Sequence, residues 1–203
     1  MVKSKLVIKP VKEKSYNAKI KFVTPYLQHR MDDTTLEERE KNGGLRKITE
    51  RKEASDPDYV RAAFYCHRNE KMECFFPESH LKRAMVAAST NYKSHVGNGR
   101  KSMKDFVSGM FSINPYQIPI REFDEISKMS AVNNNNKARI IVIRPQWNNL
   151  ELEFNITVAD DSIIDQMVLD ILQDAGRYVG CGSYRPTKQG PFGKFEVIAF
   201  TRS

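Results

Sequence analysis

Residues 150–176 constrain the fold of this chain more than any other stretch. Apolar side chains take every second position in the first part and polar ones lie between them, which predicts a strand buried on one face. Over residues 163–175 the apolar positions recur at helical spacing instead, with Asp160 and Asp161 placed to cap the start and Gly176 the end. A half-buried strand that leads directly into an amphipathic helix is typical of a mixed α+β domain.

Weaker patterns supply the other elements of such a domain. Residues 17–24 alternate apolar positions with Lys19 and Lys21, which predicts a strand whose lysines face solvent or a ligand. Helical spacing after Pro77 predicts a helix, and further strands are predicted at 137–144 and in the late sequence KFEVIAF. We expect strand 137–144 to form a β-hairpin with the alternating strand that follows it.

These elements follow one another as strand, helix, strand, strand, helix, strand. This is the split β-α-β order of ferredoxin-like folds, the scaffold of the RNA-recognition motif (RRM). We therefore predict a ferredoxin-like or RRM-like βαββαβ core, in which helices cover one face of an antiparallel sheet. A length of 203 residues suits one domain with insertions. We expect a single domain over 1–203, with a charged insertion at about 28–76 and a basic loop region at 93–136.

Composition narrows the class of protein. The three cysteines, Cys66, Cys74 and Cys181, are odd in number and widely spaced, which fits a reducing compartment better than a disulfide framework. No apolar stretch is long enough to span a membrane, and the lysine-rich start lacks the pattern of a signal peptide. We expect a cytoplasmic protein with no membrane partner. The chain has no P-loop, no Rossmann fingerprint and no nucleophile elbow, so no cofactor is expected.

The positive charge is concentrated in segments. The chain has a net charge of +8, of which residues 1–30 carry +7, while 93–104 and 175–203 carry +4 each and 159–174 carries −5. Such a distribution favours a polyanion such as nucleic acid on one face of the protein. A basic surface that only maintains solubility has the same composition.

Two loops combine this charge with residue types suited to nucleic acid. Residues 176–193 hold glycines that let a backbone approach phosphates, aromatic rings on which bases stack, and basic side chains that neutralise phosphates. Residues 93–104 form a second basic loop, and for both loops the plainer interpretation is a solvated connection. The expected nucleic-acid-binding residues are Lys19, Lys21, Arg30, Lys93, Arg100, Lys101, Lys104, Arg177, Tyr178, Tyr184, Arg185, Lys188 and Lys194.

Histidines introduce a second chemistry. His29 and His95 are candidate general bases on an RNA 2′-hydroxyl, because histidine titrates near neutral pH. Packed or surface histidines without a catalytic role are the more common case. Four residues are of types that bind zinc, namely Cys66, His67, Cys74 and His80. Their spacing matches no common paired-ligand motif, so we expect the cysteines to be buried and free and no metal to be bound.

Short motifs resemble two groups of proteins. The glycine-rich loop from Gly176 to Gly193 resembles the loop of the repeat-associated RAMP superfamily, RRM-like proteins that form the backbones and processing enzymes of CRISPR effectors. The strand that runs into Thr24-Pro25-Tyr26-Leu27 looks like the first strand of that family. The motifs at Thr24–Arg30, Gly99–Ser102 and Gly176–Phe195 also resemble those of poorly characterised bacteriophage proteins. The resemblance implies an RRM-like fold and a nucleic-acid ligand, and it implies no particular reaction.

The leading hypothesis is a non-enzymatic, phage-encoded protein that binds single-stranded RNA or DNA. It would assemble as a homo-oligomer along the strand and act in the cytoplasm, which is the host cytoplasm if the protein is phage-encoded. Two alternatives stay open: a metal-independent endoribonuclease of RAMP type, and a phage inhibitor of host defence that engages a host protein complex. Salt-sensitive binding of a nucleic acid, metal-free cleavage of RNA, and capture of a host complex distinguish the three.

Overall fold

The central sheet is built around β1. The computed structural model describes residues 12–30, 57–93, 101–132 and 138–203. In spatial order the sheet contains β4 (Phe111–Asn114), β8 (Glu151–Val158), β1 (Lys14–Phe22) and β9 (Phe195–Arg202). All three pairings are antiparallel. If these four core strands are numbered by their order in the chain, their spatial order is 2-3-1-4, which is the ferredoxin-like order. The predicted fold class is therefore confirmed.

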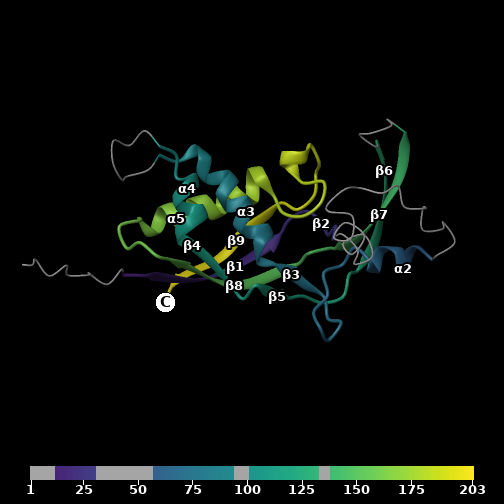
Figure 1. Ribbon diagram of the computed structural model, residues 1–203, viewed down its shortest axis with the longest axis horizontal. Coiled ribbons are helices and arrows are strands. Elements are labelled where there is room, and N and C mark those ends of the chain that lie inside the picture. The colour runs from purple at the N-terminus through teal and green to yellow at the C-terminus, as the bar shows by residue number, and fades with distance from the viewer. Residues whose placement is uncertain (1–11, 31–56, 94–100, 133–137) are drawn as a thin grey trace, which may run out of the picture.

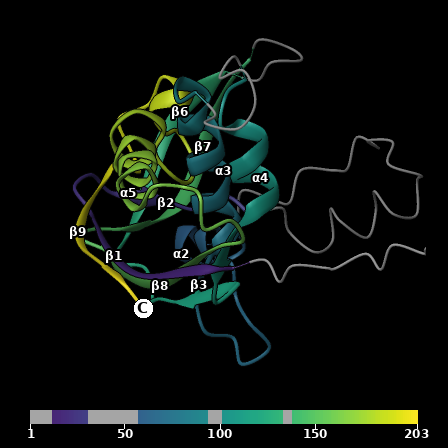
Figure 2. The same cartoon turned by 90° about the vertical axis from the view of Figure 1, so that its left-hand side faces the viewer.

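Helices cover one face of this sheet (Figures 1 and 2). They are α3 (Glu78–Ala88) and α5 (Asp165–Asp174), with α4 (Lys104–Met110) packed beside α3. The face is apolar because β1 and β8 alternate, placing Ile20, Phe22 and Phe154 on the helix side. They meet the buried stripe of α3 that includes Leu81 and Met85. Full burial of each such side chain stabilises the fold by about 2 kcal/mol.

The end of α5 differs from the prediction. Gly176 does not stop the helix, which continues as a π-helical turn, Ala175–Val179, and ends at Gly180 with a φ of 71°. A Cβ atom on Gly176 would lie 2.1 Å from the carbonyl oxygen of Phe195, so glycine is needed there for close approach to β9. At the start of the helix, the side chain of Asp160 accepts from the Ser162 N–H in the preceding turn and does not cap α5.

The predicted hairpin between strand 137–144 and β8 is wrong. β7 (Arg139–Trp147) pairs with β6 (Glu125–Val132) and with β2 (Tyr26–Leu27), and the second core strand is β4. Residues 145–147 stay in the strand, because the Trp147 side chain is fully buried and its Nε1 donates to the Arg121 carbonyl oxygen. The chain turns after Trp147, where Asn149 has a φ of 49°.

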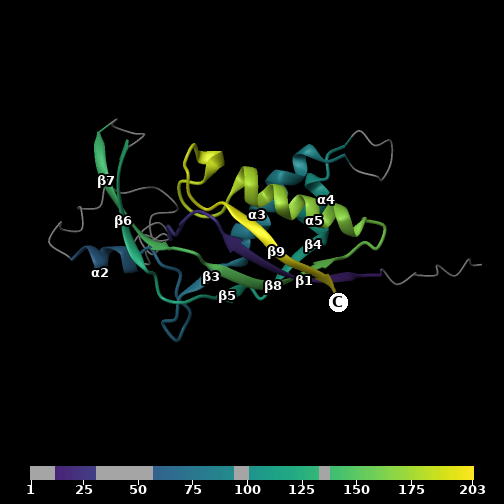
Figure 3. The same cartoon turned by 180° about the vertical axis from the view of Figure 1, so that it is seen from behind.

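The β6–β7 pair extends away from the central sheet at the end of the molecule opposite the C-terminus (Figures 1 and 3). Helix α2 (Asp58–Ala63) contacts both strands of this pair. A short pair of strands, β3 (Phe75–Pro77) and β5 (Gln117–Pro119), lies near this junction. The described part of the predicted loop region 93–136 therefore consists largely of regular elements, α4 and β4 to β6. None of the described helices is long and apolar enough to span a membrane.

Candidate nucleic-acid interface

The glycine-rich loop lies against the exit of the first strand. The Ser183 N–H donates to the Leu27 carbonyl at 2.8 Å, and the Gly193 N–H donates to the Pro25 carbonyl at 2.9 Å. Gly182 has a φ of 81°, and a Cβ there would lie 2.3 Å from the Leu27 oxygen, so a side chain would separate the two segments. Residues that are more than 150 positions apart in the sequence thus form one structural unit.

A cavity of about 500 Å³ lies between this loop and α3. The loop supplies Tyr184, Arg185 and Lys188 to its wall, and α3 supplies His80 and Arg83. None of the described residues that line the cavity is acidic. Three permanent positive charges and a partly exposed tyrosine ring therefore surround a space of the size that takes a small ligand or a nucleotide. We call this space the loop pocket.

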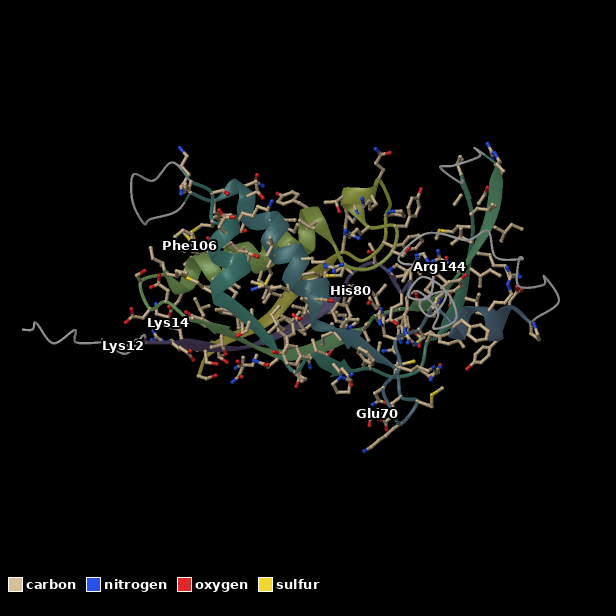
Figure 4. All side chains as sticks on the ribbon, in the orientation of Figure 1. Lys12, Lys14, Glu70, His80, Phe106 and Arg144 are labelled. Atoms are coloured by element: carbon tan, nitrogen blue, oxygen red, sulfur yellow. The ribbon has the colours of Figure 1, made fainter. Side chains whose placement is uncertain are left out.

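His80 is neutral in the loop pocket. Its Nδ1 lies 2.8 Å from the Tyr26 hydroxyl oxygen, and Figure 4 shows it on α3 near the middle of the molecule. Burial lowers the pKa of His80 to about 4, and the positive charges of Arg83 and Arg185 contribute. Burial also raises the pKa of Tyr26 well above its usual range, so the hydroxyl stays protonated. The charge of the pocket therefore comes from its arginines and its lysine.

The basic surface continues from the loop pocket across α3. A second, shallower groove of about 430 Å³ between α3 and α4 is lined by Lys82, Arg83, Thr90, Lys104 and Ser108, so Arg83 borders both spaces. Lys82 has a structural role as well, because its ammonium donates to the carbonyl oxygens of Val107 and Phe111 at the end of α4. The exposed cations of this groove are Arg83 and Lys104.

The open face of the sheet is not basic. Lys19 Nζ lies 3.1 Å from a Glu151 carboxylate oxygen and 3.0 Å from one of Glu153. Lys21 stands opposite Glu151 on β8 and Glu196 on β9. Two lysines and three glutamates therefore share this face, and the structure does not bring Lys19 and Lys21 together with the loop pocket.

The other predicted residues lie on several different elements, and none of the described ones lines either cavity. Arg177 and Tyr178 are exposed in the π-helical turn, and the Lys194 N–H donates to Thr24 Oγ1 where the loop enters β9. Lys93 and Ser102 form an isolated antiparallel β-bridge just before α4, and Lys101 is the residue before Ser102. The Arg30 N–H donates to the Tyr65 carbonyl oxygen. His95 and Arg100 lie outside the described residues.

Sequence reasoning missed Arg83 and gave His80 only as a zinc candidate. A usable signal was present, because residues 80, 83 and 87 follow one another at helical spacing beside the apolar stripe of the predicted helix. The helical spacing does not reveal that the glycine-rich loop packs over this side of α3.

The candidate zinc residues form two pairs. The Cys66 and Cys74 sulfur atoms lie 2.7 Å apart and are both buried, while the His67 and His80 rings meet at 5.7 Å between centroids. The hydrogen bond to Cys66, and then burial, raise the pKa of the Cys74 thiol, so it stays protonated. Over residues 12–30, 57–93, 101–132 and 138–203, no group of three or more His, Cys, Asp or Glu is arranged to hold a metal ion.

Comparison with known proteins gives a likeness of fold. No protein-family model matches this chain, and no curated protein matches it. Among solved structures 70 chains are similar, including a chain in the cryo-EM structure of the Type III-B Cmr-beta bound to cognate target RNA. That chain is 10% identical with a TM-score of 0.55, and the match covers 94% of this protein and 61% of that chain. This protein thus spans less than two thirds of that chain's length, and the two share a fold.

Proposed function

We propose that the protein binds single-stranded RNA, with the sugar–phosphate backbone in the loop pocket and across α3. The observation that carries this proposal is the lining of the loop pocket, where Arg83, Arg185 and Lys188 converge without an acidic residue among the described lining. Glycine-rich loops and cationic side chains suit phosphates, and Tyr184 offers a ring on which a base can stack. The open face of the sheet, on which RRM domains stack bases, has no aromatic side chain on β1 or β8 here and carries three glutamates.

The solved structure described above supports the choice of RNA. In that structure a chain of the same fold belongs to the Type III-B Cmr-beta bound to cognate target RNA. Residues Thr24–Leu27 and the loop from Gly176 to Gly193, which resemble RAMP motifs, contact each other beside the pocket. Assembly along the strand, a cytoplasmic location and a phage origin belong to this proposal as predictions from the sequence.

The double substitution Arg185→Ala and Lys188→Ala is expected to weaken RNA binding at least tenfold, because two phosphate contacts are lost. The slope of log affinity against log salt concentration should fall by about 1 to 2. Fluorescence anisotropy with a labelled single-stranded RNA over a salt series measures both quantities, and labelled DNA of the same sequence measures the preference.

Lys19→Ala is the matched control, since it removes a lysine on the open face of the sheet. It should leave RNA affinity within about twofold, because that charge is already paired. Equal losses in the control and in the loop variant would show that only net charge matters. A parent protein that binds neither RNA nor DNA at low salt would leave the host-protein partner as the better proposal.

RNA cleavage is a second candidate, because His29 also lines the loop pocket. Although its ring is partly open to solvent, surrounding protein atoms lower the pKa of His29 to about 4, and the positive charge of Arg144 adds to this. A general base must be unprotonated, so His29 would be available from about pH 5 upwards. Cleavage of RNA in the presence of a metal chelator should then have a rate that is constant between pH 5 and 8.

Loss of that cleavage in His29→Gln, with RNA affinity retained, would assign the reaction to His29. Intact RNA after long incubation with the parent protein would exclude the enzyme hypothesis and leave a binding protein. A rate that rises through pH 6.5 would point to a different, unperturbed histidine.

A further inference from the structure

Arg144 on β7 is a buried cation without an anionic partner among the described residues. The residue is 8% exposed, its Nη1 donates to the Ile143 carbonyl oxygen at 2.7 Å, and its Nε has no hydrogen-bond partner. None of the ion pairs formed by described residues includes it. Because removing a charge from water is costly, buried arginines are usually paired with a carboxylate or a bound anion.

The surroundings of Arg144 do not neutralise it. Its guanidinium carbon lies 4.5 Å from the centre of the Tyr65 ring, a cation–π contact that accommodates the charge but does not balance it. The repulsion from Arg144 contributes to the low pKa of His29, so this ring is uncharged at neutral pH and does not balance the guanidinium.

Arg144 is also close to the loop pocket. The His29 ring meets the Tyr65 ring edge to face at 5.2 Å, and Arg144 lies over the same ring. His29 in turn lines the loop pocket. One aromatic ring therefore links the wall of the pocket to the buried guanidinium, and Figure 4 shows Arg144 on the side of His80 that leads towards the β6–β7 pair.

We propose that Arg144 is an anion subsite that receives one phosphate group of the bound strand, next to the loop pocket and past His29. Nη1 of the guanidinium is occupied by the Ile143 carbonyl oxygen, which leaves Nε as the unpartnered donor for the two parallel hydrogen bonds that arginine makes with phosphate. Nε is buried, so the side chains that cover it must move aside when a phosphate binds. This inference rests on the proposed function for the claim that the phosphate belongs to RNA. Binding of a phosphate group by Arg144 does not depend on that claim.

Thermal unfolding of the full chain with inorganic phosphate tests the subsite. Phosphate is titrated at constant ionic strength against chloride into the parent, Arg144→Met, Arg144→Lys and the matched control Arg139→Met, which removes an exposed arginine from the same strand. In chloride alone Arg144→Met should melt a few degrees above the parent, because an uncompensated buried charge is gone. Phosphate should raise the Tm of the parent and of Arg139→Met by several degrees more than that of Arg144→Met.

Phosphate also stabilises proteins in general by exclusion from their surface, and that effect is common to all four proteins. Equal phosphate responses in the parent and Arg144→Met therefore overturn the subsite, whatever the difference in chloride. Arg144→Lys covers the case in which the methionine variant does not fold. It keeps the charge but lacks the fork, and it should lose most of the phosphate response.

RNA titration separates this inference from the proposed function. Arg144→Lys should weaken RNA binding about fivefold to tenfold if a phosphate of the strand occupies the subsite. Unchanged affinity in Arg144→Lys, with a loss in the Arg185 and Lys188 variant, would overturn the subsite and keep the RNA-binding function. Absence of RNA binding in the parent, together with a phosphate response that depends on Arg144, would overturn the function and keep the anion site.

Discussion

Gly193→Ala is expected to destabilise the protein by about 2–4 kcal/mol and to abolish RNA binding. Gly193 has a φ of 74°, a conformation that costs an alanine about 1 kcal/mol. Its Cβ would lie 1.8 Å from the Cys181 carbonyl oxygen, a backbone atom that cannot rotate away. The loop would have to move, breaking the hydrogen bonds from Cys181 to Gly193 and from Gly193 to Pro25 that hold the loop pocket together. Urea unfolding followed by circular dichroism measures the change in stability.

Gly109→Ala is the control for this experiment. Gly109 lies in α4, and a Cβ built there has no atom within 4 Å. Alanine favours a helix over glycine, so this variant should be as stable as the parent or about 0.5–1 kcal/mol more stable, with RNA binding unchanged. A stable, fully active Gly193→Ala protein would show that the loop has a different conformation.

Lowering the pH from 7 to 5 is expected to reduce the free energy of unfolding by about 2 kcal/mol through His80 alone. Burial lowers the pKa of His80 to about 4 in the folded protein, against about 6.5 in the unfolded chain. The unfolded state therefore binds protons first as the pH falls below 6.5, and the stability present above that pH is lost progressively down to about pH 4. His67, whose pKa is also lowered to about 4 by burial and by Arg30, should add a similar decrease.

The contribution of His80 is isolated by His80→Gln, whose amide does not titrate. This variant should be less stable than the parent at pH 7, because it changes the contact with the Tyr26 hydroxyl. Its loss of stability between pH 7 and pH 5 should be about 2 kcal/mol smaller than that of the parent, as measured by urea unfolding at both pH values. The same loss in both proteins would contradict the neutral, buried state of His80.

The sequence predicted structure best where each side chain lies either on a fully buried face or on a solvent-exposed face. Leu152, Phe154 and Ile156 alternate with Glu151 and Glu153, and that alternation identifies β8 and its buried face. The strand at β7 contains the continuous apolar run IIVI, which does not say which strand it joins. Its partner is decided by the burial of Trp147 and by pairing with β6, contacts that depend on the whole fold.

The candidate site was predicted in part for a similar reason. Tyr184, Arg185 and Lys188 are close in sequence, and the structure places them in one wall of the pocket. Lys19 and Lys21 were expected beside them, but cross-strand register puts glutamates of β8 and β9 next to these lysines. Register between strands more than 120 residues apart is not visible in either local pattern. Arg83 enters the site only because the loop packs beside α3.

The position of β1 between β8 and β9 has a consequence for how the chain folds during synthesis. β1 has no partner in the central sheet until residues 151–158 of β8 have left the ribosome, and its second neighbour, β9, follows only at residues 195–202. Contacts between such distant segments form slowly, because a long loop must close before any of them stabilises the sheet. Both edges of β1 therefore remain unpaired until late in synthesis, and such unpaired strand edges make a nascent chain prone to aggregation.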